Sequence, residues 1–113
     1  MEYEVLSRYY MRHGVPFNKS IIICGALLHD IGKLTEFTCV GDRVQHSVND
    51  ELMRHPLSGA IIAAQTGLPD NIVHLIATHS FEGEHSYQTA ESTFVRSIDM
   101  FAFNCEVRGL EKK

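Results

Sequence analysis

Apolar residues recur with helical spacing along most of this chain. The first such segment spans residues 2 to 12 and ends at His13-Gly14. The second, residues 19 to 31, begins after Asn18, which is a suitable N-cap, and it is apolar on nearly every side. A short helix of that kind is expected in the middle of a helical bundle.

The helical pattern resumes after an irregular stretch. Residues 33 to 48 show no clean period, so we expect a loop there with at most a short turn. Helices follow over residues 57 to 66, which Pro56 opens, and over residues 69 to 79. A last helix is expected over residues 90 to 107. The side chains of this helix that should face inwards are Phe94, Val95, Ile98, Phe101 and Ala102.

The periodicity predicts the fold class. No segment alternates convincingly with period two, so we expect an all-α fold, a compact bundle of about five helices. No linker, repeat or low-complexity tract divides the sequence, and we expect residues 1–113 to form a single domain. The longest apolar run is too short to span a bilayer, and the N-terminus lacks a secretory signal. We therefore expect a cytoplasmic protein with no membrane contact.

Charge and cysteine content argue against several classes of protein. The chain has 10 basic and 14 acidic residues and no basic stripe, so strong nucleic-acid binding by this domain alone is not expected. The three cysteines form no CxxC pair, which argues against a disulfide framework and against a zinc site made of cysteines. Cys24 lies inside an apolar run and is interpreted as a small core residue.

Seven histidines among 113 residues direct attention to metal chemistry, although composition alone does not make them ligands. His29 and Asp30 are adjacent at the end of the second expected helix. Neighbouring helical side chains diverge by about 100°, so both reach one metal only if it lies beside the helix end. An imidazole beside a carboxylate suits Mn, Fe, Co, Ni or Zn. For an isolated pair, the alternative is a histidine favoured by the helix dipole and an aspartate that binds loop amides.

The pair is part of a longer motif. The segment Leu27-Leu28-His29-Asp30-Ile31-Gly32-Lys33 resembles the LLHDIGK signature of the HD superfamily of metal-dependent phosphohydrolases. Three later segments resemble further motifs of that family, in the same order: His55-Pro56-Leu57-Ser58-Gly59-Ala60, Ile76-Ala77-Thr78-His79 and Arg96-Ser97-Ile98-Asp99. The family often has paired histidines where this chain reads His79-Ser80. The resemblance covers nearly the whole chain.

The resemblance implies roles for particular residues. His29, Asp30 and Asp99 would be metal ligands, with Asp30 placed to bridge two metals in a dinuclear version. His55 and His79 would complete a second metal site. The catalytic candidates are Asp30 and Lys33, and the lysine is expected to contact a substrate phosphate or stabilise developing charge. One or two divalent ions are implied, and the spacing does not distinguish among Mn, Fe, Co, Ni, Mg and Zn.

The reaction that the resemblance implies is hydrolysis of a nucleotide or another phosphoester by metal-activated water. The extra histidines resemble the two-metal phosphodiesterase members more than the one-metal nucleotidases. Residues 81 to 84 are loosely similar to a loop in the HD domains of bacterial 3′–5′ exoribonucleases. RNA would then be a partner only with a separate binding module, such as an OB-fold. Arg54 and Arg96 could approach a phosphate, but a surface arginine is the more common role, and each is interpreted as one.

One ligand of the family is missing. Its first metal histidine normally lies on the opening helix, and counting back from His29 places it at or just before the first residue, where no histidine occurs. Either the chain is a fragment of a longer protein, or Glu2 or Glu4 replaces the histidine, or the metal site is incomplete. The alternative function is therefore a non-catalytic regulatory or binding module. A third interpretation is a plain helical interaction domain without metal chemistry. The sequence also allows a homodimer and does not fix the oligomeric state.

Overall fold

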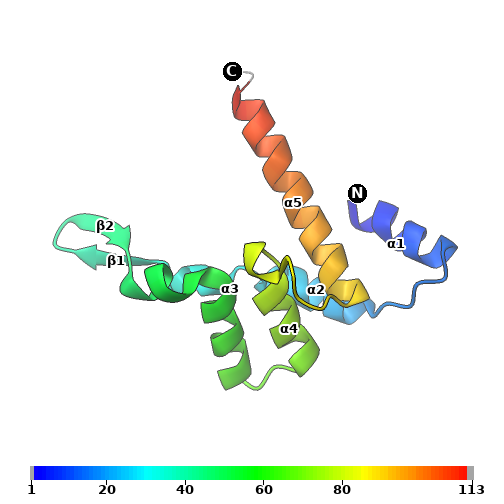
Figure 1. The fold of residues 1–113 in the computed structure, drawn as a ribbon, viewed down its shortest axis with the longest axis horizontal. Coiled ribbons are helices and arrows are strands. Elements are labelled where there is room, and N and C mark those ends of the chain that lie inside the picture. The colour runs from blue at the N-terminus through cyan, green and yellow to red at the C-terminus, as the bar shows by residue number, and fades with distance from the viewer. Residues whose placement is uncertain (1, 112–113) are drawn as a thin grey trace.

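The computed structural model describes the backbone of residues 2–111 and the side chains of residues 3–48 and 51–105. The fold is all-α apart from one small hairpin, as the helical periodicity predicts (Figure 1). The α-helices are α1 (Glu2–Arg12), α2 (Lys19–Leu28), α3 (Val48–Gln65), α4 (Asp70–Thr78) and α5 (Ala90–Glu111). The shorter elements are the 3₁₀ helices η1 (Ile31–Thr35) and η2 (Phe81–Gly83) and the strands β1 (Phe37–Val40) and β2 (Arg43–His46).

The two ends of α2 are set by short polar segments. The side chain of Asn18 accepts hydrogen bonds from two backbone N–H groups of the first turn, at 2.9 and 3.3 Å. At the other end the α-helix stops at Leu28, and Asp30 has φ −98° and ψ 14°, outside the helical range. The chain then tightens into η1 instead of continuing α2 to Ile31. This break changes the direction of the chain at the His29-Asp30 pair.

α3 consists of two helical segments joined by a kink. Arg54 lies at the kink with φ 54° and ψ 165°, and it is the only residue other than glycine with positive φ in the described backbone. Pro56 follows two residues later, is fully buried, and has no N–H to donate to the preceding turn. The sequence predicts a helix that opens at Pro56, and the structure adds the segment that begins at Val48.

The core consists of two clusters of buried side chains, and α4 contributes to both. One cluster joins α2, α4 and α5 through Ile22, Leu75, Phe94 and Val95. The other joins α3 to α4 through Ala60, Ala63, Ile72 and Ile76. Because α4 is apolar on two sides, it fixes the relative positions of α2, α3 and α5. Candidate ligands follow the end of α2 and lie inside α3 and α5.

α1 packs onto this core through aromatic rings. The ring centroids of Tyr3 and Tyr10 lie 5.4 and 5.6 Å from that of Phe94. The hydroxyl of Tyr10 also donates a hydrogen bond to the carbonyl oxygen of Ala90, at 2.8 Å. Tyr3, Leu6 and Tyr10 all pack against the core, which confirms the apolar face that their spacing predicts.

The expectation that residues 33 to 48 form a loop is wrong, because this stretch contains η1 and the antiparallel β1–β2 hairpin. Phe37 pairs with His46 and Val40 with Arg43, around a turn in which Gly41 has φ 63°. Both strands are exposed along their whole length, so they show no alternation of apolar and polar residues. The Gly41-Asp42 pair was the signal that could have identified the turn.

Two predictions about burial in α2 are also wrong. This helix does not lie in the middle of a bundle, since the Leu27 side chain is 79% exposed and only Ile22 and Gly25 are buried. Cys24 is exposed and is not a core residue. α2 packs with one face against α4 and α5, and its opposite face has no described neighbour. Apolar residues occur on both faces, so their pattern could not reveal this difference.

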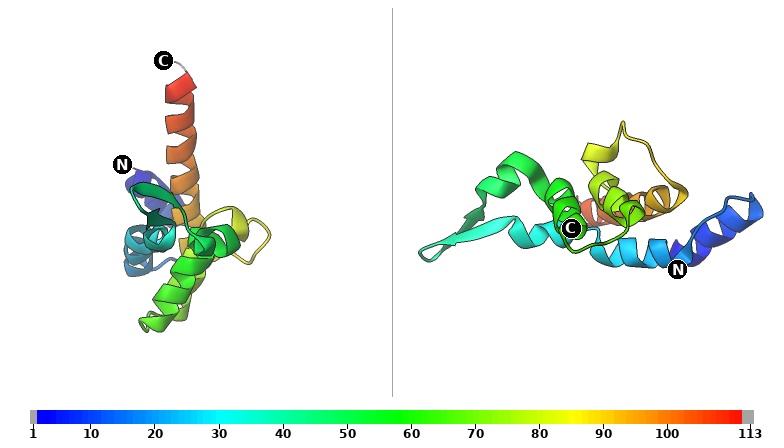
Figure 2. Two further views of the ribbon diagram at one scale, coloured as in Figure 1. Left: turned by 90° about the vertical axis from the view of Figure 1, so that its left-hand side faces the viewer. Right: turned by 90° about the horizontal axis from the view of Figure 1, so that it is seen from below.

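α5 departs from prediction in its second half. Phe94 and Val95 are buried and Ile98 is partly buried, as expected, but Phe101 and Ala102 are exposed. The reason is that α5 continues well beyond the other helices (Figure 2). In the described part of the chain, no helix has both the length and the apolar character needed to cross a membrane.

Candidate metal centre

The centre begins where α2 ends. His29 is the C-cap of α2, and its Nδ1 lies 2.7 Å from the carbonyl oxygen of Ala26. Nδ1–H therefore donates to this carbonyl, which leaves the lone pair on Nε2. His29 Nε2 lies 3.3 Å from Asp30 Oδ2 and 3.4 Å from Asp99 Oδ1 on α5. The two adjacent residues thus reach one point beside the helix end, as the sequence argument requires.

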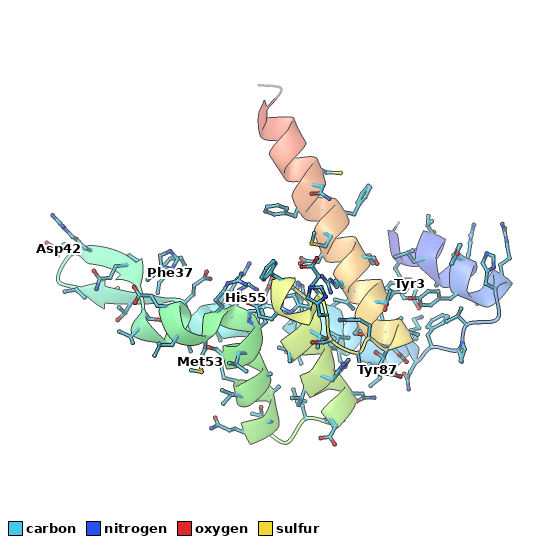
Figure 3. The ribbon with its side chains drawn as sticks, in the orientation of Figure 1. Tyr3, Phe37, Asp42, Met53, His55 and Tyr87 are labelled. Atoms are coloured by element: carbon cyan, nitrogen blue, oxygen red, sulfur yellow. The ribbon has the colours of Figure 1, made fainter. Side chains whose placement is uncertain are left out.

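Two further histidines approach the same aspartate from α3 and α4. His55 follows the kink in α3, and its Nε2 lies 3.3 Å from Asp30 Oδ1. His79 is the C-cap of α4, and its Nε2 lies 3.4 Å from the same oxygen. The His79 ring centroid is 4.9 Å from that of His29 and 5.2 Å from that of His55. Figure 3 shows His55 near the middle of the molecule, where the elements meet.

His79 is the most enclosed of these side chains. It is 0% exposed, and its Nδ1 donates to the carbonyl oxygen of Ile76 at 2.7 Å. The Nε2 atoms of His29 and His79 are both buried and have no hydrogen-bond partner. Leaving two such acceptors unsatisfied costs free energy, and a cation placed between them would remove that cost.

The donor set fits a divalent metal. One ligand atom each from His29, Asp30 and His79 lies within 4.8 Å of the other two. Imidazole nitrogen and carboxylate oxygen are ligands that divalent transition metals accept, and hydrogen bonds from Nδ1 to backbone carbonyls are typical of metal-binding histidines. Asp30 contacts all three histidines, and Asp99 reaches the group through His29 alone.

The surroundings favour the ionisation states that metal binding needs. Burial lowers the pKa of His55 and of His79 below the ordinary value of 6.5, although the Asp30 carboxylate opposes this shift. Both imidazoles are therefore neutral at pH 7. Burial by itself would raise the pKa of Asp30, but the electrostatic influence of the neighbouring His29 and Lys33 side chains outweighs it and lowers that pKa below its ordinary value of 3.8. A neutral imidazole and an ionised carboxylate are the forms that coordinate metal.

Comparison with known proteins identifies the family. A family model for the HD domain matches residues 3–104. The chain belongs to the HD domain family. HD domains typically bind divalent metals, and many are metal-dependent phosphohydrolases. No curated protein and no solved structure matches this chain.

The first metal histidine of the family is missing from this HD domain, and the structure shows where its possible replacement Glu4 lies. Glu4 is exposed and lies outside the group of ligand atoms found among the described side chains, and the side chain of Glu2 lies outside the described residues. Tyr3 lines an apolar cavity of about 380 Å³ together with His29 and Asp99. Glu4 is therefore not part of the ligand group in this arrangement of α1, and replacement of the histidine by Glu2 stays a prediction.

A second pocket, of about 510 Å³, lies next to the candidate ligands. Its polar side includes Asp30, His55 and Asp99 together with two cationic residues, Lys33 and Arg54. Lys33 Nζ lies 3.4 Å from Asp30 Oδ2, at the edge of this pocket. Arg54 is exposed, as its interpretation as a surface arginine predicts, and it also lines this pocket. Its position directly before His55 was the signal that could have revealed this place.

We expect the metal-free protein to lose stability as the pH falls from about 7.5 to about 5.5. The unfolded chain binds protons on its histidines near pH 6.5, whereas burial of His55 and His79 lowers their pKa and keeps them neutral in the folded state. The shift of Asp30 acts only below about pH 4 and does not contribute in this range. Urea unfolding at both pH values, with chelator present, measures the effect.

A pair of variants makes this expectation specific. His79→Asn should reduce the difference in unfolding free energy between the two pH values, because it removes one buried titratable ring. His13→Asn, which changes an exposed histidine, should retain the full difference. Equal pH dependence in the two variants would show that burial of His79 does not cause the effect.

Proposed function

We propose that this HD domain is a metal-dependent phosphohydrolase, of the phosphodiesterase kind, that hydrolyses a nucleotide or another phosphoester. The observation that carries the proposal is the convergence of three histidines from α2, α3 and α4 on one carboxylate, Asp30. Two of these histidines have buried Nε2 atoms without a hydrogen-bond partner. A helical domain has no structural need for such a group, and a metal centre does.

Each residue of the centre has a proposed role. A single divalent ion would be held by His29, Asp30 and His79, whose ligand atoms lie within 4.8 Å of one another. In the two-ion arrangement that the family resemblance implies, His29, Asp30 and Asp99 would hold one ion, and His55 and His79 would hold the second together with Asp30. When bound, a divalent metal lowers the pKa of a water molecule and polarises the phosphoryl oxygen. The Nδ1–H groups of His29 and His79 donate to backbone carbonyls and so keep both rings oriented toward Asp30.

Lys33 is proposed to bind the substrate phosphate. It lies in η1, three residues after Asp30, and its ammonium group is already drawn to that carboxylate at 3.4 Å. Once metal charge offsets the carboxylate, the ammonium group is available to a phosphoryl oxygen in the adjoining pocket. The proposed partners are accordingly a small phosphoester or nucleotide, and RNA only through a separate binding module.

The apolar side of the pocket is suited to a nucleobase. Met100, Ala102 and Phe103 line it, and Phe103 lies one helical turn after Asp99 on the same face of α5. We expect Phe103→Ala to raise the KM for a nucleotide substrate about tenfold, because stacking of a base on an aromatic ring contributes about 1–3 kcal/mol. The matched control is Phe101→Ala, since Phe101 is equally exposed but does not line the pocket. Equal KM values for the two variants would exclude this base contact.

Hydrolysis assays test the proposed function. The protein would be freed of metal with a chelator, reloaded separately with Mn²⁺, Co²⁺, Ni²⁺, Fe²⁺, Zn²⁺ or Mg²⁺, and assayed with bis(p-nitrophenyl) phosphate and with nucleotides. We expect turnover that the chelator abolishes and at least one metal restores. A metal-loaded protein that turns over none of these substrates would contradict the proposal.

A specific observation favours the second candidate, a non-catalytic regulatory or binding module. No described side chain replaces the first metal histidine of the family. In such a module the centre would bind metal weakly or act as a ligand-sensing site, and the pocket would bind a phosphoester without cleaving it. Binding of a nucleotide with no turnover under any metal condition would select this candidate.

A further inference from the structure

Arg54 holds a backbone conformation that side-chain-bearing residues rarely adopt. With φ 54° and ψ 165°, it lies where glycine would be accommodated without strain. Such strain persists only where the surrounding structure requires it, and it occurs preferentially at functional sites. Here it lies directly before His55, and the kink turns the His55 imidazole toward Asp30, at 3.3 Å. The position of a candidate ligand thus depends on the strained residue.

The side chain of Arg54 is held by a carboxylate outside the metal group. Its guanidinium forms an ion pair with Glu82 in η2. The next residue, Gly83, packs so closely on the end of α4 that an added Cβ would lie 2.0 Å from the carbonyl oxygen of Thr78. The Arg54–Glu82 pair therefore links the segments that carry His55 and His79, and it gives the guanidinium a defined position.

The charges of the pocket show what this guanidinium faces. Asp30 and Asp99 supply two negative charges, which a divalent cation would balance. Lys33 and Arg54 are then the cationic side chains in the lining, from two different elements, η1 and α3. Glu82, which pairs with Arg54 through one nitrogen, Nη1, is not part of that lining. A phosphoryl group is the ligand that matches two convergent cations, and arginine binds its oxygens in a bidentate manner.

We propose that Arg54 is a second phosphate-binding residue of this pocket and that Glu82 is the positioning residue that holds its guanidinium. The inference rests on the proposed phosphohydrolase function and names a residue that the family motif does not contribute. The strain at Arg54 serves two purposes: it directs His55 to Asp30, and it keeps the guanidinium at the pocket.

The test uses inorganic phosphate as the probe, titrated by calorimetry into the protein with and without added Mn²⁺. We expect Arg54→Gln to weaken phosphate binding about tenfold or more, because it removes charge-assisted hydrogen bonds. The matched control is Arg43→Gln, which removes the same charge from the exposed hairpin. Figure 3 shows the tip of that hairpin, at Asp42, far from His55.

Further variants separate a phosphate contact from a role in folding. Arg54→Gly should lose phosphate affinity as Arg54→Gln does, yet unfold at the same or a higher temperature, because it relieves the strain. Arg54→Lys should recover part of the affinity. Glu82→Gln should weaken phosphate binding by a smaller factor. In hydrolysis, Arg54→Gln should raise KM and leave kcat within about twofold, the pattern of a contact made equally to substrate and transition state.

The outcomes are distinguishable. Phosphate affinity that is equal in Arg54→Gln and Arg43→Gln would overturn the role of Arg54, and so would a wild-type protein that binds no phosphate. A wild-type protein that binds phosphate through Arg54 but cleaves no phosphoester would leave this inference standing and refute the proposed hydrolase function. Arg54→Gly and Arg54→Gln variants that lose metal as well as phosphate would assign Arg54 a role in placing His55 alone.

Discussion

Asp30→Asn should abolish metal binding and phosphoester hydrolysis while leaving the helical fold intact. Among the described side chains, Asp30 is the carboxylate that lies within 3.4 Å of His29, His55 and His79, and because its pKa is lowered it is fully ionised at neutral pH. An uncharged amide in its place cannot offset the charge of a divalent ion. Loss of a residue that only supports a metal ligand already lowers metal affinity about 10–100-fold. Because Asp30 is itself a proposed ligand, we expect Asp30→Asn to lower metal affinity by about 100-fold or more. Hydrolysis should fall by about 10²–10³-fold or more.

Calorimetric titration measures metal binding, and the circular dichroism spectrum shows whether the helical fold is intact. The matched control is Asp42→Asn, which makes the same change on the exposed hairpin turn. It should bind metal as the wild type does. A folded Asp30→Asn variant that binds metal as tightly as Asp42→Asn would remove Asp30 from the centre.

Gly32→Ala should be among the most destabilising single substitutions in this chain. An added Cβ would lie 1.9 Å from the carbonyl oxygen of His55 and 2.7 Å from the backbone N of Gly59. Both obstacles are backbone atoms, so relief requires η1 and α3 to move apart. We expect a loss of about 3 kcal/mol or more in unfolding free energy, and a Tm lower by more than about 10 °C. Molecules that still fold should bind metal weakly, because the same movement separates Asp30 from His55.

Gly41→Ala is the comparison that isolates the clash. Gly41 has φ 63°, so alanine there is strained, but nothing lies within 4 Å of the added Cβ. That conformational strain alone costs about 1–2 kcal/mol. Thermal and urea unfolding of the two variants should differ clearly. Equal stability would mean that η1 and α3 do not pack as closely as the structure shows.

The candidate ligands could be selected from the sequence because motif order depends on the fold. His29, Asp30, His55, His79 and Asp99 stand in the family's order, and the structure brings all five together. The sequence did not show that these residues make different numbers of contacts. Asp30 contacts three histidines, whereas Asp99 contacts only His29. This difference depends on how the helices pack and not on the spacing of the residues.

The parts of the fold that were mispredicted share a physical cause. The positions of the helices along the chain and the apolar face of α1 follow from local periodicity and capping, and these predictions were confirmed. The exact boundaries were less accurate, since α2 ends at Leu28 and α3 begins at Val48. Exposure of Leu27 and Phe101 depends on whether another element covers α2 and the end of α5, which periodicity does not report. The kink at Arg54 likewise comes from the packing of α3 against η1, since no residue type in the sequence requires positive φ at that position.

Metal content is the measurement that tests the central claim most directly. Elemental analysis would be made on protein purified without a histidine tag, beside Asp30→Asn purified in the same way. We expect about one or two equivalents of a divalent transition metal in the wild type and none in the variant. Wild-type protein that contains no metal, and that binds none when Mn²⁺, Fe²⁺, Co²⁺ or Ni²⁺ is added, would contradict the assignment of His29, Asp30 and His79 as a metal centre.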